Sequence, residues 1–209
     1  GKVFYDELHD PPSPPRPYGA AGWTEKDGDL ILYDRYDLWR FDPDTGSSER
    51  LTRGRETRTV YRYVPLDEEQ KYLDSREPWL LTVFDEKDKS SGYAAYDPRR
   101  KALRMLLKGP YRYGRPEKAE NADRMLFTRE SFQEFPDLHV AGPDFENPVR
   151  ISHANPQQEQ YRWGGIELVQ WTSLDGLELT GMLVKPEGFA PAKKYPMIVN
   201  FYEKSSDGL

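Results

Sequence analysis

Serine and histidine are the residues of this chain that could carry out acyl transfer, yet their spacing argues against a complete catalytic set. That chemistry needs a serine on a sharp strand-to-helix turn, written G-x-S-x-G, followed by an acid and a histidine. None of the eleven serines has glycine both two positions before and two positions after it. His139, one of three histidines with His9 and His153, alternates with apolar neighbours, which favours a structural role over that of a base. We therefore expect no Ser-His-Asp triad in this chain.

Other chemistries find even less support. No histidine and carboxylate cluster has the spacing of a zinc site, and no glycine-rich phosphate cradle follows a predicted strand. Asp42, Asp97 and Asp144 recur at predicted turns, where an aspartate can bond its own backbone two residues on. We interpret them as structural and expect neither a metal nor a cofactor.

Composition excludes several classes of protein. The 28 aromatic residues (14 Tyr, 9 Phe, 5 Trp) indicate a packed chain, and the net charge of -6 with scattered basic residues argues against nucleic-acid binding. There are no cysteines, which excludes disulfides and thiolate metal sites. No apolar stretch approaches a membrane span, and no basic start precedes an apolar core at the N-terminus. We expect a soluble chain without a membrane partner, any export signal lying outside it; bacterial cytoplasm and periplasm both remain open.

Alternating hydrophobicity predicts strands throughout, grouped into a repeat. Expected strands are 3–8, 30–33, 37–42, 49–52, 79–84, 92–97 and 101–107, and the aromatic segments TVYRYVP and GPYRYGR should each open a further group. The turn segments FDPDTG, YDPRRK and GPDFEN begin at residues 41, 96 and 142, about 45 to 55 residues apart. This is the period of four-stranded β-propeller blades. A β-sandwich is the alternative, but the longer repeat copies strand order together with the aspartate turn.

The N-terminal passage DPPSPPRP carries four prolines within five positions, which cannot lie in a central strand. We interpret it as a loop in polyproline conformation; a ligand for an aromatic groove is the alternative.

The pattern changes near residue 160. Alternating strands are expected at 166–172 and 177–185, joined through Asp175 and Gly176, a strong hairpin signal. A proline-rich loop then leads to the apolar run 196–202, with Met197, Ile198, Val199 and Phe201. Such a continuous run usually lies in a sheet covered on both faces.

These residues resemble the prolyl oligopeptidase family of serine peptidases, especially its dipeptidyl peptidase and acylaminoacyl peptidase-like branches. The string WTSLDGLELTGMLVKPEGFAPAKKYPMIVNFYE is similar to the start of that family's catalytic domain, with its D-G hairpin, G-x-L-x-K-P stretch and K-K-Y-P. In the family a β-propeller precedes an α/β-hydrolase domain. The resemblance thus implies a mainly β chain: about three C-terminal, four-stranded propeller blades in 1–160, and the first strands of the hydrolase in 161–209.

The resemblance implies a fragment, because most hydrolase strands and the triad histidine would follow Leu209. The parent would be a serine peptidase that cleaves short peptides, with the propeller limiting access by size, and this piece would be inactive. Flanks that lack their neighbours should make the fragment associate with itself. The alternative is a stand-alone β-rich binding or scaffold module.

Two sites are implied by the same resemblance. Tyr202 matches a tyrosine whose hydroxyl donates to the oxyanion in the dipeptidyl peptidase branch; the alternative is an aromatic that closes the edge of the core. Glu68 and Glu69 are similar to paired glutamates that grip a free amino terminus, but LDEEQKY is typical of a turn between strands.

Overall fold

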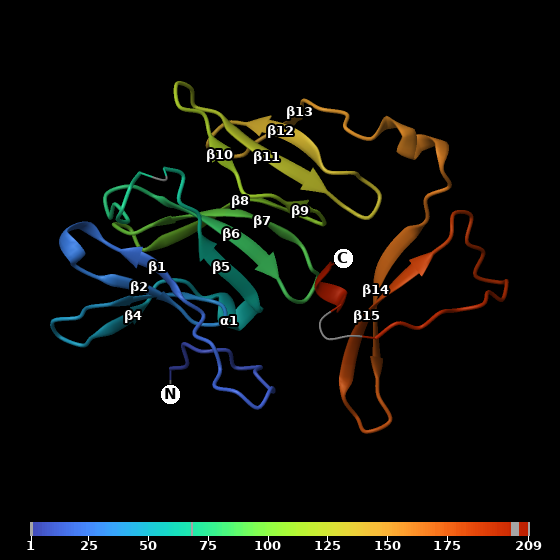
Figure 1. Cartoon of the computed structure of the whole chain (residues 1–209), viewed down its shortest axis with the longest axis horizontal. Coiled ribbons are helices and arrows are strands. Elements are labelled where there is room, and N and C mark those ends of the chain that lie inside the picture. The colour runs from blue at the N-terminus through green and yellow to red at the C-terminus, as the bar shows by residue number, and fades with distance from the viewer. Residues whose placement is uncertain (1, 68, 202–204, 209) are drawn as a thin grey trace.

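The computed structural model describes residues 2–67, 69–201 and 205–208. Its strands form four antiparallel sheets, and its helical segments are no longer than five residues (Figure 1). The prediction of a mainly β chain is therefore confirmed. Within the described ranges, no helix has the length and apolar character needed to cross a bilayer.

The first sheet is a four-stranded meander. Its strands are β1 (Ala20–Trp23), β2 (Leu30–Tyr33), β3 (Leu38–Phe41) and β4 (Ser48–Arg50), and a short helical segment, η1 (Glu25–Asp27), joins the first two. Helix α1 (Gly54–Thr57) leads to the next sheet. Leu30 pairs with Phe41, which places the predicted strands in the expected order.

The second sheet repeats the meander with longer strands. They are β5 (Thr59–Tyr63), β6 (Trp79–Asp85), β7 (Ser91–Asp97) and β8 (Ala102–Gly109). The aromatic segment TVYRYVP supplies its first strand, as predicted.

The third sheet begins with an interrupted strand. Both β9 (Arg112–Tyr113) and β10 (Glu117–Lys118) pair with β11 (Met125–Glu130), and β12 (Asp137–Ala141) and β13 (Val149–Arg150) follow. Pro116 lies between the two pieces, and proline has no N–H to donate to a ladder. GPYRYGR therefore opens the third sheet as predicted, but only in part as a regular strand.

The second sheet lies between the other two. One core cluster joins Ile31 and Leu38 of the first sheet to Leu81 and Val83 of the second. Another joins Leu80 and Tyr93 of the second sheet to Met125, Phe127 and Phe145 of the third sheet and its β12–β13 turn. Since β6 is covered on both sides, its sequence WLLTVF is nearly continuous in apolar residues, whereas β2 buries alternate residues only.

The predicted aspartate turns are confirmed. Asp42 accepts from the amides of Asp44 and Thr45, at 2.9 and 3.1 Å. Asp97 accepts from the amides of Arg99 and Arg100, and Asp144 accepts from the amide of Glu146. All three therefore cap turns between the last two strands of a sheet.

The fourth sheet is a hairpin of β14 (Gly165–Thr172) and β15 (Glu178–Lys185), joined by the predicted Asp-Gly turn. Gly176 has φ of 85°, a conformation that glycine adopts without strain. The segment η2 (Pro156–Gln160) precedes the hairpin, and η3 (Ser205–Gly208) ends the described chain.

Two predicted strands are wrong. Residues 3–8 form only an isolated bridge between Tyr5 and Pro17, because the prolines that follow cannot extend a ladder. The described part of 196–202 forms no strand, and Ile198 is 96% exposed. A strand needs a neighbour to take up its backbone hydrogen bonds, and no described strand pairs with this run.

Candidate functional site

The residue predicted to act on an oxyanion, Tyr202, lies outside the described residues, and so does Glu68. The segment before Tyr202 is open to solvent: Met197, Val199 and Phe201 are all more than half exposed. Glu69 lies in the β5–β6 connection, where its amide bonds the Asp67 carboxylate. Glu69 thus lies between two strands, as the sequence indicates.

His139 and His9 lie in different environments. His139 is 2% exposed, stacks on Phe127 with ring centroids 5.9 Å apart, and places Nδ1 3.1 Å from the Asp137 carbonyl oxygen. Its predicted structural role is confirmed. Nε2 of His9 lies 3.1 Å from Oγ of Ser13, but both are exposed in the proline-rich loop. Among the described residues, no serine hydroxyl contacts a histidine that a carboxylate also holds.

The sheet connections gather at two opposite ends of the molecule. One end carries the β2–β3, β6–β7 and β11–β12 turns and residues 151–164, from which the chain passes into the hairpin (Figure 1). We call this end the linker face. The other end carries the β1–β2, β3–β4 and β7–β8 turns, linked by contacts such as Ser75 to Glu25 and Lys101 to Glu49.

Glu86 is the centre of an ion-pair network on the linker face. Arg35 donates to both of its carboxylate oxygens at 3.0 and 2.9 Å, and Tyr36 donates to it at 2.8 Å. Burial, helped by the Glu86 carboxylate, raises the pKa of Tyr36. The network joins the β2–β3 turn to the β6–β7 turn, so it fixes the first sheet against the second.

Arg55 links the N-terminal segment to the same face. Its guanidinium contacts Glu7 at 2.6 Å and Asp34 at 3.1 Å, and the bond to Glu7 is the main reason that its pKa is raised. Burial by itself would raise the pKa of Asp34. The amides of Asp37 and Tyr36, with help from Arg55, outweigh that effect and lower the pKa.

A carboxylate at the start of the third strand of a sheet recurs in two places. Asp37 accepts from the Thr52 hydroxyl at 2.7 Å and from the amides of Gly54 and Arg55. Asp137 likewise accepts from the Ser152 hydroxyl at 2.5 Å and from the Ala154 amide at 2.9 Å. Each carboxylate therefore ties the connection that leaves its sheet back onto the sheet.

An arginine accompanies both carboxylates, but only one pair is close. Arg150 lies 2.5 Å from Asp137, whereas Arg50 lies 3.8 Å from Asp37. The Ser152 hydrogen bond has the largest effect on the pKa of Asp137 and lowers it; burial, the next largest, acts in the opposite direction, and the Ala154 amide and Arg150 lower the pKa further. The ionised form of Asp137 is thus favoured in the folded chain.

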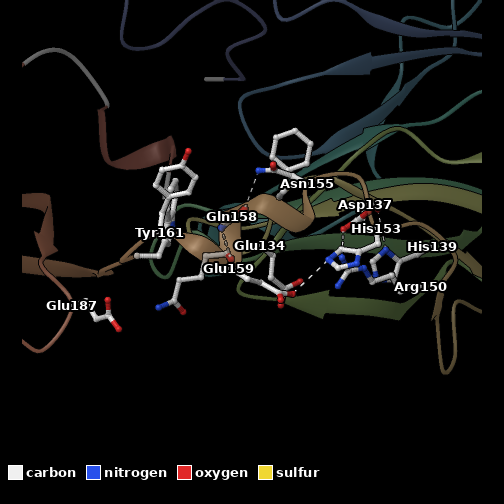
Figure 2. Close-up of a pocket in the computed structure, with 13 residues that line it drawn as sticks. Glu134, Asp137, His139, Arg150, His153, Asn155, Gln158, Glu159, Tyr161 and Glu187 are labelled. Carbon is white, nitrogen blue, oxygen red and sulfur yellow. Dashed lines mark hydrogen bonds and ion pairs between the residues drawn. The ribbon is translucent and has the colours of Figure 1, made fainter.

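Beside Asp137 the linker face is hollowed into a pocket of about 300 Å³, which we call the His153 pocket (Figure 2). Four parts of the chain form it: the β11–β12 turn, the strands β12 and β13, residues 153–163 and the loop after β15. Its lining is polar and aromatic: Gln133, Glu134, Phe135, Asp137, His139, Arg150, His153, Asn155, Gln158, Glu159, Tyr161, Trp163 and Glu187. Figure 2 shows Tyr161 and Glu187 at one end, and Asp137, His139 and Arg150 at the other.

A second pocket of about 380 Å³ lies where the hairpin leaves the sheets. It is lined by Lys89 and Tyr111 from the second sheet's connections, by Phe132 from the third, and by Ile166 of β14. Lys89 also contacts Asp207 of η3 at 2.6 Å. In the described ranges no group of three or more potential ligands is placed to hold a metal ion.

Sequence reasoning missed both pockets and the paired carboxylates. A partial signal exists for the carboxylates: the segments from Asp37 to Thr52 and from Asp137 to Ser152 share an acid, an arginine and a hydroxyl at the same spacing. The pockets carry no such signal, since their walls come from different sheets.

Several solved structures are similar to this chain. The chain is similar to a protein assigned as a dipeptidyl aminopeptidase IV from Bacteroides ovatus ATCC 8483, with a TM-score of 0.62 and 14% identity over 87% of this chain and 28% of that one. It is also similar to puromycin hydrolase, with a TM-score of 0.53 and 18% identity over 85% and 27% of the two chains. A serine-to-alanine variant of puromycin hydrolase in complex with PGG gives a TM-score of 0.51 and 19% identity over the same shares.

At the level of the fold, this likeness confirms the resemblance to the prolyl oligopeptidase family that the sequence predicts. This chain spans less than a third of the length of each of these solved chains. Neither protein-family models nor curated protein sequences give a match to it.

Proposed function

We propose that this chain is part of a serine peptidase similar to the prolyl oligopeptidase family. In this proposal 1–160 are the last blades of a β-propeller, about three of four strands each, and 161–209 begin an α/β-hydrolase domain. The observation that carries the proposal is the likeness to the dipeptidyl aminopeptidase IV-type structure over 87% of the chain. Three face-packed antiparallel sheets of similar strand order support the propeller assignment.

The parent enzyme would hydrolyse short peptides, with the propeller as a size filter, while these 209 residues would be inactive. Inactivity follows from the absence of any G-x-S-x-G serine, without which the nucleophile has no exposed turn. We expect no labelling by a fluorophosphonate serine probe and no cleavage of aminoacyl nitroanilides. Covalent labelling of any serine would contradict this part of the proposal.

The gene itself tests the assignment independently of activity. The peptidase proposal requires that codons for a G-x-S-x-G serine, an acid and a histidine continue the reading frame after Leu209. A frame that stops there would favour the stand-alone β-rich binding or scaffold module.

Tyr202 is proposed as an oxyanion donor in the parent enzyme. Removing one such donor typically lowers kcat by about 10² to 10³. The change Tyr202→Phe in the whole peptidase removes the hydroxyl and keeps the ring, so we expect a loss of that size in kcat with an unchanged melting temperature. An unchanged kcat would instead favour an aromatic that only closes the core.

Copies of this chain are proposed to associate through the apolar segment 197–201. Its apolar side chains are exposed, no described strand pairs with it, and an unpaired segment can pair with another chain. Light scattering should therefore give a dimer or larger species, and Ile198→Lys should shift it toward the monomer. A monodisperse monomer of the unchanged chain would refute self-association and leave the peptidase assignment untouched.

A further inference from the structure

The His153 pocket presents three aromatic rings to solvent, and one of them, that of Trp163, is held by its contacts. Phe135 is 47% exposed, Tyr161 67% and Trp163 46%. Trp163 donates its indole N–H to the backbone carbonyl of Phe132, and the ring centroids of Trp163 and Phe132 lie 6.0 Å apart. The indole is therefore held in place before any ligand arrives, which lowers the entropic cost of binding.

The same pocket carries uncompensated negative charge. Two of its acids are neutralised locally, Glu134 by Arg129 at 2.7 Å and Asp137 by Arg150 at 2.5 Å. Two are not: among the described residues, neither Glu159 nor Glu187 has a lysine or arginine within ion-pair distance. Glu159 has only His153, whose Nε2 lies 3.6 Å from its Oε1 (Figure 2).

The pocket also offers a neutral acceptor. Gln133 uses its side-chain amide nitrogen to bond the Gly164 carbonyl at 3.0 Å, which leaves its amide oxygen to accept. The Gln158 side-chain amide donates to the backbone carbonyl of Gln133 at 2.9 Å, which holds the β11–β12 turn against η2. The lining therefore combines exposed π-faces with carboxylate and amide oxygens.

We propose that the His153 pocket binds the guanidinium group of an arginine side chain in a peptide or protein partner. A guanidinium is planar, stacks on aromatic rings and donates in a fork to carboxylates. An ammonium is more strongly hydrated and does not stack, so it fits this lining less well. The volume of about 300 Å³ is at the small end of ligand pockets and suits a single side chain. The proposal needs no catalytic serine and goes beyond the peptidase assignment.

Calorimetric titration of the 209-residue chain tests the proposal. The probes are Nα-acetyl-arginine N-methylamide, its neutral citrulline analogue, its lysine analogue and unblocked triglycine. We expect the arginine probe to bind most tightly and the citrulline analogue to give no heat, because it lacks the charge. Binding of citrulline equal to that of arginine would overturn the proposal. So would binding of triglycine or lysine in preference to arginine, since the pocket would then select an ammonium.

Variants place the binding in the pocket. The double change Glu159→Gln and Glu187→Gln removes both free charges and should weaken the arginine probe about tenfold. Tyr161→Ala should also weaken it, whereas Tyr161→Phe keeps the ring and should not. Glu146→Gln, an exposed acid on the β12–β13 turn at the opposite end of the sheet, is the matched control and should bind as the unchanged chain does.

These side chains are exposed, so their replacement should leave the fold intact, which far-UV circular dichroism checks. Equal binding by the double variant and the unchanged chain would refute the assignment to this pocket. A fluorophosphonate result of either sign would not bear on it, which keeps this test separate from that of the peptidase proposal.

Discussion

Two apolar runs of similar sequence differ in burial in this molecule. The run WLLTVF of β6 is buried between two neighbouring sheets, with Leu81 at 0% exposure, while MIVNF at 197–201 lies in solvent. Both would be assigned to covered strands on sequence alone. The difference shows that a continuous apolar run predicts a strand buried on both faces. The run is buried only where neighbouring sheets pack against it.

The largest expected difference between the two regions is in stability. Leu81→Ala removes a fully buried side chain between the first and second sheets, so the free energy of unfolding should fall by about 2 to 5 kcal/mol. Urea unfolding followed by tryptophan fluorescence measures this.

The matched control is Leu174→Ala at the tip of the hairpin, where the side chain is fully exposed. Its effect should stay within about 0.5 kcal/mol. A loss at Leu174 as large as that at Leu81 would mean that the hairpin is packed against a partner in solution.

A smaller but distinct effect is expected at the buried carboxylate of the first sheet. Asp37→Ala leaves the Thr52 hydroxyl and the amides of Gly54 and Arg55 without their acceptor, at a cost of about 1 to 3 kcal/mol. The urea midpoint measures the loss. Asp175→Ala in the exposed hairpin turn, which removes the acceptor of the Ser173 hydroxyl, should cost much less. Equal losses would contradict the contrast between sheets and hairpin.

The smallest expected effect is the acid sensitivity of the third sheet. Since the folded-state pKa of Asp137 is lowered, its ionised form stabilises the fold above the ordinary aspartate pKa of about 4, and this contribution is lost as the pH falls below that value. The difference in urea midpoint between the unchanged chain and Asp137→Asn should therefore be present at neutral pH and shrink in acid. A difference that does not change with pH would assign the loss to hydrogen-bond geometry instead of charge.

The sequence by itself determined the local elements. Alternation located most strands of the first two sheets to within two residues, Asp175 and Gly176 specified the hairpin, and Asp42, Asp97 and Asp144 specified turns. These features depend on the alternation of side chains along a strand and on hydrogen bonds between residues two or three positions apart. Both can be predicted from a short stretch of sequence.

Only the tertiary structure decided what depends on how sheets stack. It brought Arg35 to Glu86 across the first and second sheets and formed the His153 pocket from the third sheet, the chain after β13 and the loop after β15. It also left 197–201 exposed, with no strand partner among the described residues. The physical reason is that burial and ion pairing between distant residues depend on which surfaces pack together. The alternation of apolar and polar residues along a strand does not indicate which sheet will pack against it.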